Sequence, residues 1–157
     1  MTFQKTVDYV DISKFMGKWY VQAGRFTFME KDVHNAIEIY QWDEEKEQIK
    51  ISFDYRQGGF DGKKKSIPQT GSIYNHQTNA HWKVSPIWPL KFDYLVIALA
   101  EDYSWCAIGV PSQKYLWIMT RESNLTEVEF EKILSKVKET GYSIEDLSQV
   151  PHQYSNY

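Results

Sequence analysis

The sequence is poor in cysteine and has no long hydrophobic run, and each absence excludes a class of protein. Cys106 is the only cysteine in 157 residues, so no intramolecular disulfide can form. No stretch approaches the roughly 20 apolar residues that a helix needs to span a bilayer. The first residues, Met1–Thr6, also lack the apolar segment and the small-residue cleavage site of a signal peptide. A hydrophobic core must therefore hold the fold together without crosslinks.

An excess of positive charge is also missing. Lys and Arg number 18 against 21 Asp and Glu, and the resulting net charge of −3 argues against nucleic acid as a partner. No low-complexity tract and no repeat with a period of about 20 to 50 residues interrupts the chain. We therefore expect one continuous domain over residues 1–157.

Catalytic and metal-binding motifs are absent as well. Residues 58–63 resemble a phosphate-binding loop, but Gln57 stands where the first glycine belongs and no Ser or Thr follows Lys63. Cys106 lies in an apolar segment without a neighbouring base, which is typical of an inert buried thiol. We predict no catalysis, no cofactor and no metal site. The four histidines lack the spacing of metal ligands: His34, His76, His81 and His152.

Aromatic residues are abundant, at 16% of the chain with six Trp and eleven Tyr. This content suits a β-rich fold with large cross-strand pairs, or a cavity lined by rings, and the two interpretations are compatible. Residues 48–56 alternate strictly between apolar and polar, which indicates a half-buried strand. Together with this strand, eight short strand-like segments broken by turn signals at near-regular spacing predict a sandwich or a barrel: residues 18–25, 33–42, 48–56, 66–75, 80–85, 92–100, 104–110 and 115–120.

One helix is expected after the last strand. Thr126 and Glu129 form a capping box, and Gly141 suits the position after a helix C-terminus. We expect the helix over about residues 127–140, packed outside the strands, with an extended tail behind it. The predicted fold is all-β, with eight antiparallel strands and one C-terminal helix. The helix presents a single apolar stripe made of Phe130, Ile133, Leu134 and Val137.

Three motifs in order along the chain resemble the signatures of the lipocalin family. Residues 11–20 resemble a short 3₁₀ turn, here about residues 11–17, that leads into a first strand through Gly17-Lys18-Trp19. Residues 94–103 resemble two strands joined by an acidic turn that ends in Tyr, and Arg121 closes the last strand. The resemblance covers about residues 8–153 and is closest to bacterial lipocalins of the Blc type. It implies an up-and-down barrel over about residues 18–121.

The up-and-down order assigns the motif residues and the ligand residues to different places. The motif residues should converge at the barrel floor, where Arg121 stacks on Trp19, and their role is structural: Gly17, Trp19, Asp102, Tyr103 and Arg121. The open mouth is expected at residues 26–32, 58–65, 86–90 and 111–114. Alternating positions should form an interior wall that contacts the ligand: Phe53, Tyr55, Trp82, Val84, Tyr94, Val96, Trp117 and Met119. The register of the second, fourth and seventh strands stays open.

The resemblance implies binding, storage or transport of a small hydrophobic or amphipathic ligand, a fatty acid or a lysophospholipid. Lys63, Lys64 and Lys65 are either contacts for its headgroup or part of a solvated loop. A membrane-surface association and a monomer or homodimer fit this interpretation. The resemblance also implies an outer-membrane or periplasmic location. The cytoplasm is the alternative, because no signal peptide or lipobox is visible.

Two other classes of function remain open at this point. An enzyme on a lipocalin-like barrel would need inward nucleophiles, acids or bases, and the candidates are Cys106, Asp93 and Glu38. A barrel filled by its own side chains would instead be a structural or interaction module.

Overall fold

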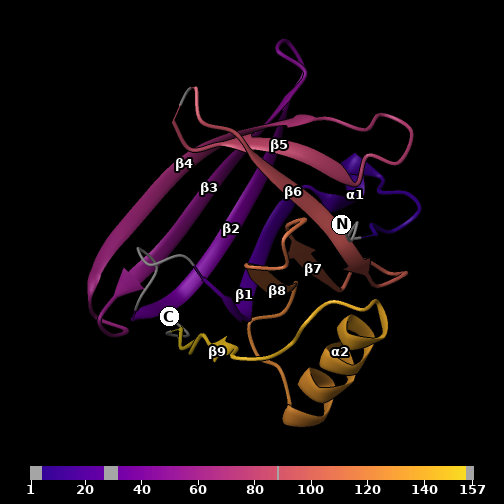
Figure 1. Cartoon of the computed structure of the whole chain (residues 1–157). Helices are drawn as coiled ribbons and strands as arrows, with labels where there is room; N and C mark the ends of the chain where they lie inside the picture. The colour runs from indigo at the N-terminus through magenta and orange to yellow at the C-terminus, as the bar shows by residue number, and fades with distance from the viewer. Residues whose placement is uncertain (1–4, 27–31, 88, 155–157) are drawn as a thin grey trace.

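The computed structural model describes residues 5–26, 32–87 and 89–154, and its strands close into one barrel (Figure 1). The strands follow one another in chain order, each antiparallel to the next, and β1 pairs with both β2 and β8. This confirms the predicted eight-stranded antiparallel fold. The strands are β1 Gly17–Arg25, β2 Val33–Asp43, β3 Gln48–Gln57, β4 Lys63–Ile73, β5 His81–Ser85, β6 Phe92–Leu99, β7 Trp105–Gly109 and β8 Leu116–Thr120.

The bounds of β4 differ from the prediction, whereas the other strands of the barrel agree within one residue at each end. The expected strand was 66–75, but β4 begins at Lys63 and ends at Ile73. Lys63, Lys64 and Lys65 extend the ladder because they pair with the last residues of β3. Lysine has a weak preference for strands, and the backbone hydrogen bonds to β3 override it. The assignment of residues 63–65 to a loop is therefore wrong.

The segment before β1 forms a single α-helical turn, α1 Ile12–Phe15, and the expected 3₁₀ turn over residues 11–17 is wrong. Phe15 N donates to Asp11 O and Met16 N donates to Ile12 O, each at 3.1 Å, which is the α-helical i→i−4 pattern. The Asp11 carboxylate caps the turn by accepting a hydrogen bond from Ser13 N at 3.0 Å. The turn lies across one end of the barrel (Figure 1).

Arg121 and Trp19 form the floor at this end. The Arg121 guanidinium carbon lies 3.7 Å from the centroid of the Trp19 ring. Its Nη1 donates to Lys18 O at 2.7 Å, while Nη2 donates to Lys14 O at 2.8 Å and to Met16 O at 2.9 Å. These carbonyls include the last ones of α1, which have no partner within the helix. One side chain from the end of β8 thus joins α1 to β1.

Gly17 and the β6–β7 turn complete the floor. Gly17 has a φ of +103°, and a Cβ there would lie 3.4 Å from Arg121 Nη1. The Tyr103 hydroxyl accepts a hydrogen bond from Asp11 N at 2.9 Å, and Asp102 Oδ1 holds the turn by accepting one from Ser104 N at 3.0 Å. The structure therefore brings the five motif residues to one end of the barrel.

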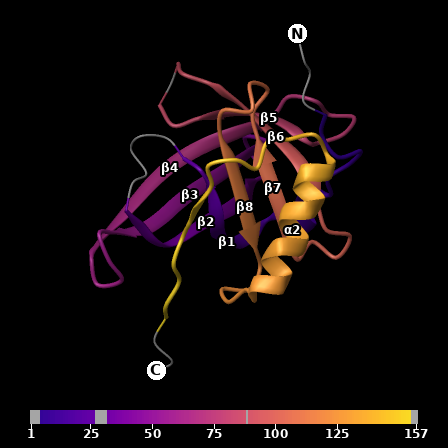
Figure 2. The same cartoon turned by 60° about the horizontal axis from the view of Figure 1, so that its bottom comes forward.

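Helix α2 Glu127–Glu139 packs against the outside of the barrel, where it contacts β6 and lies beside β7 (Figure 2). Ile133 and Val137 are buried against outward-facing residues of the sheet, in a cluster separate from the barrel interior. The capping box of Thr126 and Glu129 is present. Within the part of the chain that the structure describes, no helix has the length and apolar character needed to cross a membrane.

The C-terminal tail fills a gap in the wall. The ladder between β1 and β2 extends only from Gly17 to Tyr20. Beyond it the short strand β9 Ser148–Gln149 pairs with Ala23 and Gly24, near the C-terminal end of β1. Val150 N donates to Gln22 O at 2.8 Å, and Asn35 N of β2 donates to Pro151 O at 3.0 Å. The tail thus bridges two strands that do not pair there directly.

The floor predicts an order of stability losses. Trp19→Ala removes a side chain with 0% exposure and should lower the free energy of unfolding by about 3–5 kcal/mol. Arg121→Ala should lower it by less, because the apolar ring stays. Lys18→Ala, at an exposed neighbouring position, is the control and should be nearly neutral. Chemical denaturation followed by circular dichroism measures all three, and a Trp19→Ala variant as stable as the parent would contradict this role.

Candidate functional site

The residues predicted for the interior wall belong to one cluster inside the barrel. Six of them are buried, with exposed fractions of 0 to 6%: Phe53, Tyr55, Trp82, Val84, Val96 and Met119. Tyr94 and Trp117 pack against the same cluster but are only half-buried. The structure therefore brings all eight together on the inner face of β3, β5, β6 and β8.

The pairing of β2 gives the register that the sequence left open. Glu38 lies opposite Trp19 of β1 and opposite Phe53 of β3. Side chains that lie directly opposite in an antiparallel pair share a face, so Glu38 faces inward, as does Tyr40 two residues further on. Sequence reasoning missed Tyr40 as a wall residue. Its signal was masked because β2 carries apolar Ile39 on the outside.

The registers of β4 and β7 follow in the same way. Ile67 of β4 lies opposite Phe53 and therefore faces inward. Cys106 and Ile108 of β7 lie opposite Met119 and Trp117 of β8. Both β7 residues are buried in the interior cluster, which completes the wall.

Stacked aromatic rings rise from the floor into the interior. Trp82 stacks on Tyr94, with ring centroids 5.1 Å apart and planes 7° from parallel. Tyr94 stacks on Trp117 at 6.4 Å and 21°. Phe15 of α1 meets Trp82 edge-on at 5.4 Å. Phe15 and Trp82 have 0% exposure, so the floor is filled, whereas Tyr94 and Trp117 keep accessible surface inside the barrel.

The interior also contains polar groups. The hydroxyls of Tyr40 and Tyr94 form a hydrogen bond with each other, and the Tyr40 hydroxyl also donates to Met119 Sδ at 3.9 Å. Burial raises the pKa of both phenols well above their usual value, and the negative charge of Glu38 raises both further. Burial likewise raises the pKa of the Cys106 thiol. The phenols and the thiol are therefore neutral at physiological pH.

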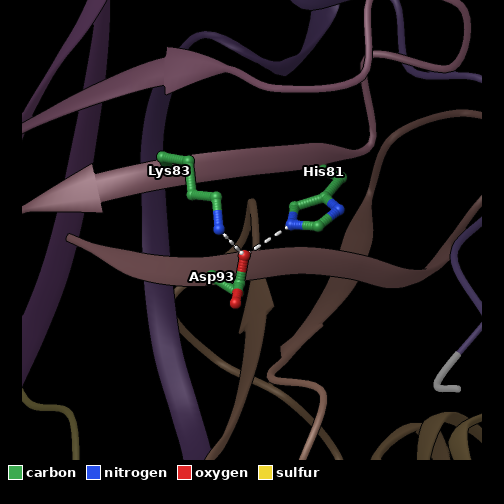
Figure 3. Close-up of polar contacts among 3 residues, drawn as sticks. All are labelled: His81, Lys83 and Asp93. Atoms are coloured by element: carbon green, nitrogen blue, oxygen red, sulfur yellow. Dashed lines mark hydrogen bonds and ion pairs between the residues drawn. The ribbon is translucent and has the colours of Figure 1, made fainter.

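The three residues considered for an enzyme do not come together. Glu38 and Cys106 are inside the barrel, but Asp93 precedes inward-facing Tyr94 in β6 and lies on the outer face. Its Oδ1 lies 2.7 Å from His81 Nε2 and 2.5 Å from Lys83 Nζ of β5 (Figure 3). Burial raises the pKa of Asp93, but hydrogen bonds from these two side chains outweigh it and hold the pKa below its usual value. Asp93 therefore cannot act together with either interior residue.

The mouth carries lysines on both faces of the wall. Lys65 lies opposite inward-facing Tyr55, so Lys65 is on the inner face, whereas Lys64 lies opposite Arg56 on the outer face. Lys63, two residues before Lys65, shares its face, and all three are exposed. Residues 27–31 and Trp88, which belong to predicted mouth segments, lie outside the described residues.

A surface recess of about 690 Å³ lies at the closed end, away from the predicted wall. It is bounded by α1 and by the β2–β3 and β4–β5 turns, with Trp42 and Ile73 beside charged Glu44 and Lys46. None of the eight wall residues lines it. Among residues 5–26, 32–87 and 89–154, no three His, Cys, Asp or Glu side chains gather as metal ligands.

A closed eight-stranded barrel with a stacked Arg–Trp floor, an aromatic interior and one outer helix defines the class of this protein. The chain belongs to the lipocalin-like family, whose domain model matches residues 10–152. This match covers the floor, the wall and α2.

Relatives in sequence agree with this assignment. Over 66 residues the chain is 38% identical to temperature-induced lipocalin-1 of Arabidopsis thaliana, a match that covers 42% of this chain and 36% of the plant protein. Over 150 residues it is 24% identical to the outer membrane lipoprotein Blc of Vibrio cholerae, covering 95% of this chain and 86% of the relative. The first match thus spans only about a third of the plant protein, whereas the second spans most of both chains.

Solved structures share the fold at low identity. Insecticyanin of the tobacco hornworm Manduca sexta superposes with a TM-score of 0.72 at 16% identity, over 96% of this chain and 84% of that one. Lobster apocrustacyanin A1 gives 0.69 at 14% identity, over 90% and 79% of the two chains. These similarities establish the architecture.

Proposed function

We propose that the protein binds, stores or transports a small hydrophobic or amphipathic molecule inside the barrel, specifically a fatty acid or a lysophospholipid. The observation that carries this proposal is the accessible surface of Tyr94 and Trp117 above a filled floor. Burying about ten methylene groups contributes roughly 8 kcal/mol. Association costs about 4–15 kcal/mol, so contacts to the headgroup must supply the rest.

The shape of the wall favours one flexible acyl chain over a rigid polycycle. Tyr94 and Trp117 stack at 21°, and Tyr55 and Phe53 pack beside each other at 5.0 Å between ring centroids. We infer that an alkyl chain, which can adjust its torsions, packs against such flat rings better than a rigid polycycle does. The interior thus suits single-chain lipids.

Lys63 and Lys65 are the proposed contacts for the anionic headgroup. Both are exposed and share the inner face of β4 with Ile67. An acyl chain that enters the barrel would leave its carboxylate or phosphate at this level, where an ammonium group can pair with it. Lys64 points to the other face and has no such role.

We also propose that the protein works at the cell envelope, as a monomer or homodimer with an affinity for the membrane surface. The similarity to the outer membrane lipoprotein Blc of Vibrio cholerae supports this location. Immunoblots of fractionated source cells should detect the protein with the envelope. Detection in the cytosol alone would contradict the proposal.

A charge inside the wall should abolish binding. Trp117→Glu places a carboxylate where an acyl chain would lie, and an unpaired charge against hydrocarbon is costly. Delipidated parent should bind a fluorescent fatty acid with a Kd of about 1–10 µM, near −8 kcal/mol, and tryptophan emission should shift. Lys50→Glu on the outer face is the matched control and should bind like the parent.

The lysines provide a second matched pair in the same assay. Lys65→Ala should weaken displacement of the probe by a lysophospholipid, whereas Lys64→Ala should not. Equal loss in both variants would indicate adsorption to the surface. If the delipidated parent binds no probe, the transport function fails and the filled barrel of a structural module replaces it.

A further inference from the structure

Large apolar side chains are exposed at the mouth, in and beside the connection between β5 and β6. Ile87 is 68% exposed, and Leu90 and Phe92 are each 55% exposed. Leu90 N donates to Ile87 O at 2.9 Å, so a tight turn brings these two residues close together. Phe60, in the turn between β3 and β4, is 37% exposed. A group of exposed apolar side chains at one end of a protein is typical of a surface that binds a membrane or another protein.

The position of Phe92 connects this apolar group with the barrel interior. Phe92 lies opposite the buried wall residue Val84 of β5, so it faces inward at the rim. The end of β5 and the start of β6 lie on the side of the barrel away from α1, as does the turn between β3 and β4 (Figure 1). The apolar residues therefore border the predicted mouth and not the floor.

Charge is distributed unequally between the two ends of the barrel. The turns that follow β2, β4 and β6, at the closed end, contain six acidic residues and one lysine: residues 43–47, 74–80 and 100–104. The four connections at the mouth, with the first residues of β4, contain six lysines and three acidic residues: residues 26–32, 58–65, 86–91 and 110–115. The chain is therefore polarised, although its net charge is only −3. An anionic surface attracts the mouth of such a molecule and repels its closed end.

We propose that the mouth docks on an anionic lipid bilayer, with Ile87, Leu90 and Phe92 at the hydrocarbon boundary and the lysines of β4 on the headgroups. This inference rests on the proposed affinity for the membrane surface and deepens it, because it names the face of the protein and the charge of the lipid. A bilayer offers hydrocarbon to the apolar side chains and negative charge to the lysines. Single apolar side chains on two separate connections suit a fluid bilayer, which adapts to their spacing, better than the fixed shape of a protein partner.

The orientation has a consequence for the exchange of ligand. With the mouth against the bilayer, a single-chain lipid passes between membrane and barrel without exposing its whole chain to water. Phe92 lies on this route, because it is both exposed and at the rim of the inner wall. Docking thus lowers the cost of moving hydrocarbon through water.

Co-sedimentation of the delipidated full chain with lipid vesicles tests the docking and needs no variant. The parent should bind vesicles of equal parts phosphatidylcholine and phosphatidylglycerol at least about tenfold more tightly than vesicles of phosphatidylcholine alone. High salt should remove most of this difference, because it screens the lysines from the headgroups. Equal binding to both kinds of vesicle would contradict the proposal.

Two matched pairs of variants locate the docking surface. Leu90→Asp should weaken binding to the anionic vesicles about tenfold, because a carboxylate is repelled by the headgroups and costly near hydrocarbon. Val128→Asp makes the same change at a site on α2 that is 65% exposed, and it should bind like the parent. Lys64→Glu should weaken binding at least about fivefold at low salt. Lys50→Glu, beside Asp43 near the closed end, is its control and should change little.

A fluorescent label reports which face meets the lipid. Cys106 has 0% exposure, so a maleimide dye reacts with an introduced cysteine and not with the native one. An environment-sensitive dye on Leu90→Cys should brighten and shift to the blue when anionic vesicles are added, whereas the same dye on Val128→Cys should not. The same response at both sites, or none at residue 90, would contradict the proposed orientation.

The outcomes separate docking from ligand binding. Leu90 and Lys64 belong neither to the predicted wall nor to the proposed headgroup contacts, so Leu90→Asp and Lys64→Glu should bind the soluble fatty-acid probe like the parent. If the parent binds the probe but no anionic vesicle, the docking inference fails and binding in the barrel stands. If the parent binds anionic vesicles through its mouth but no probe, docking stands and the ligand function fails.

Discussion

The stacking of the Arg121 guanidinium on the Trp19 ring, at 3.7 Å, determines which end of the barrel is closed. Because the same guanidinium satisfies the last carbonyls of α1, the helical turn is held across the floor and Phe15 is pressed beneath Trp82. Above this floor the rings of Trp82, Tyr94 and Trp117 stack on one another. Closure of this end is thus a consequence of one cation–π contact and its hydrogen bonds.

The interior combines two requirements that usually conflict. Apolar rings exclude water and favour hydrocarbon, while the tyrosine hydroxyl pair and Glu38 introduce hydrogen-bonding groups into the same space. Burial keeps the two phenols protonated, so they can donate hydrogen bonds at any physiological pH. In small-molecule sites, apolar area commonly supplies affinity and a few polar atoms supply specificity.

The sequence predicted the barrel well because most of its signals are local. The alternation in residues 48–56 set the inner face of β3, and the capping box at Thr126 set the start of α2. It could not predict the register of β2, where Ile39 faces outward, Glu38 faces inward, and a bulge between His34 and Ile37 shifts the alternation. The strand at Lys63–Lys65 was not predicted for a similar reason, because its pairing with β3 is a tertiary interaction that composition does not reveal.

We propose that the barrel interior holds one single-chain amphiphile above the aromatic floor. Native mass spectrometry of freshly purified protein tests it most directly, because a bound lipid is seen as an added mass without any probe. We expect a population that carries one lipid molecule per chain, released by organic denaturation and identified as a fatty acid or lysophospholipid. Purification under native conditions that yields only the bare chain, with no uptake when such lipids are added back, would contradict it.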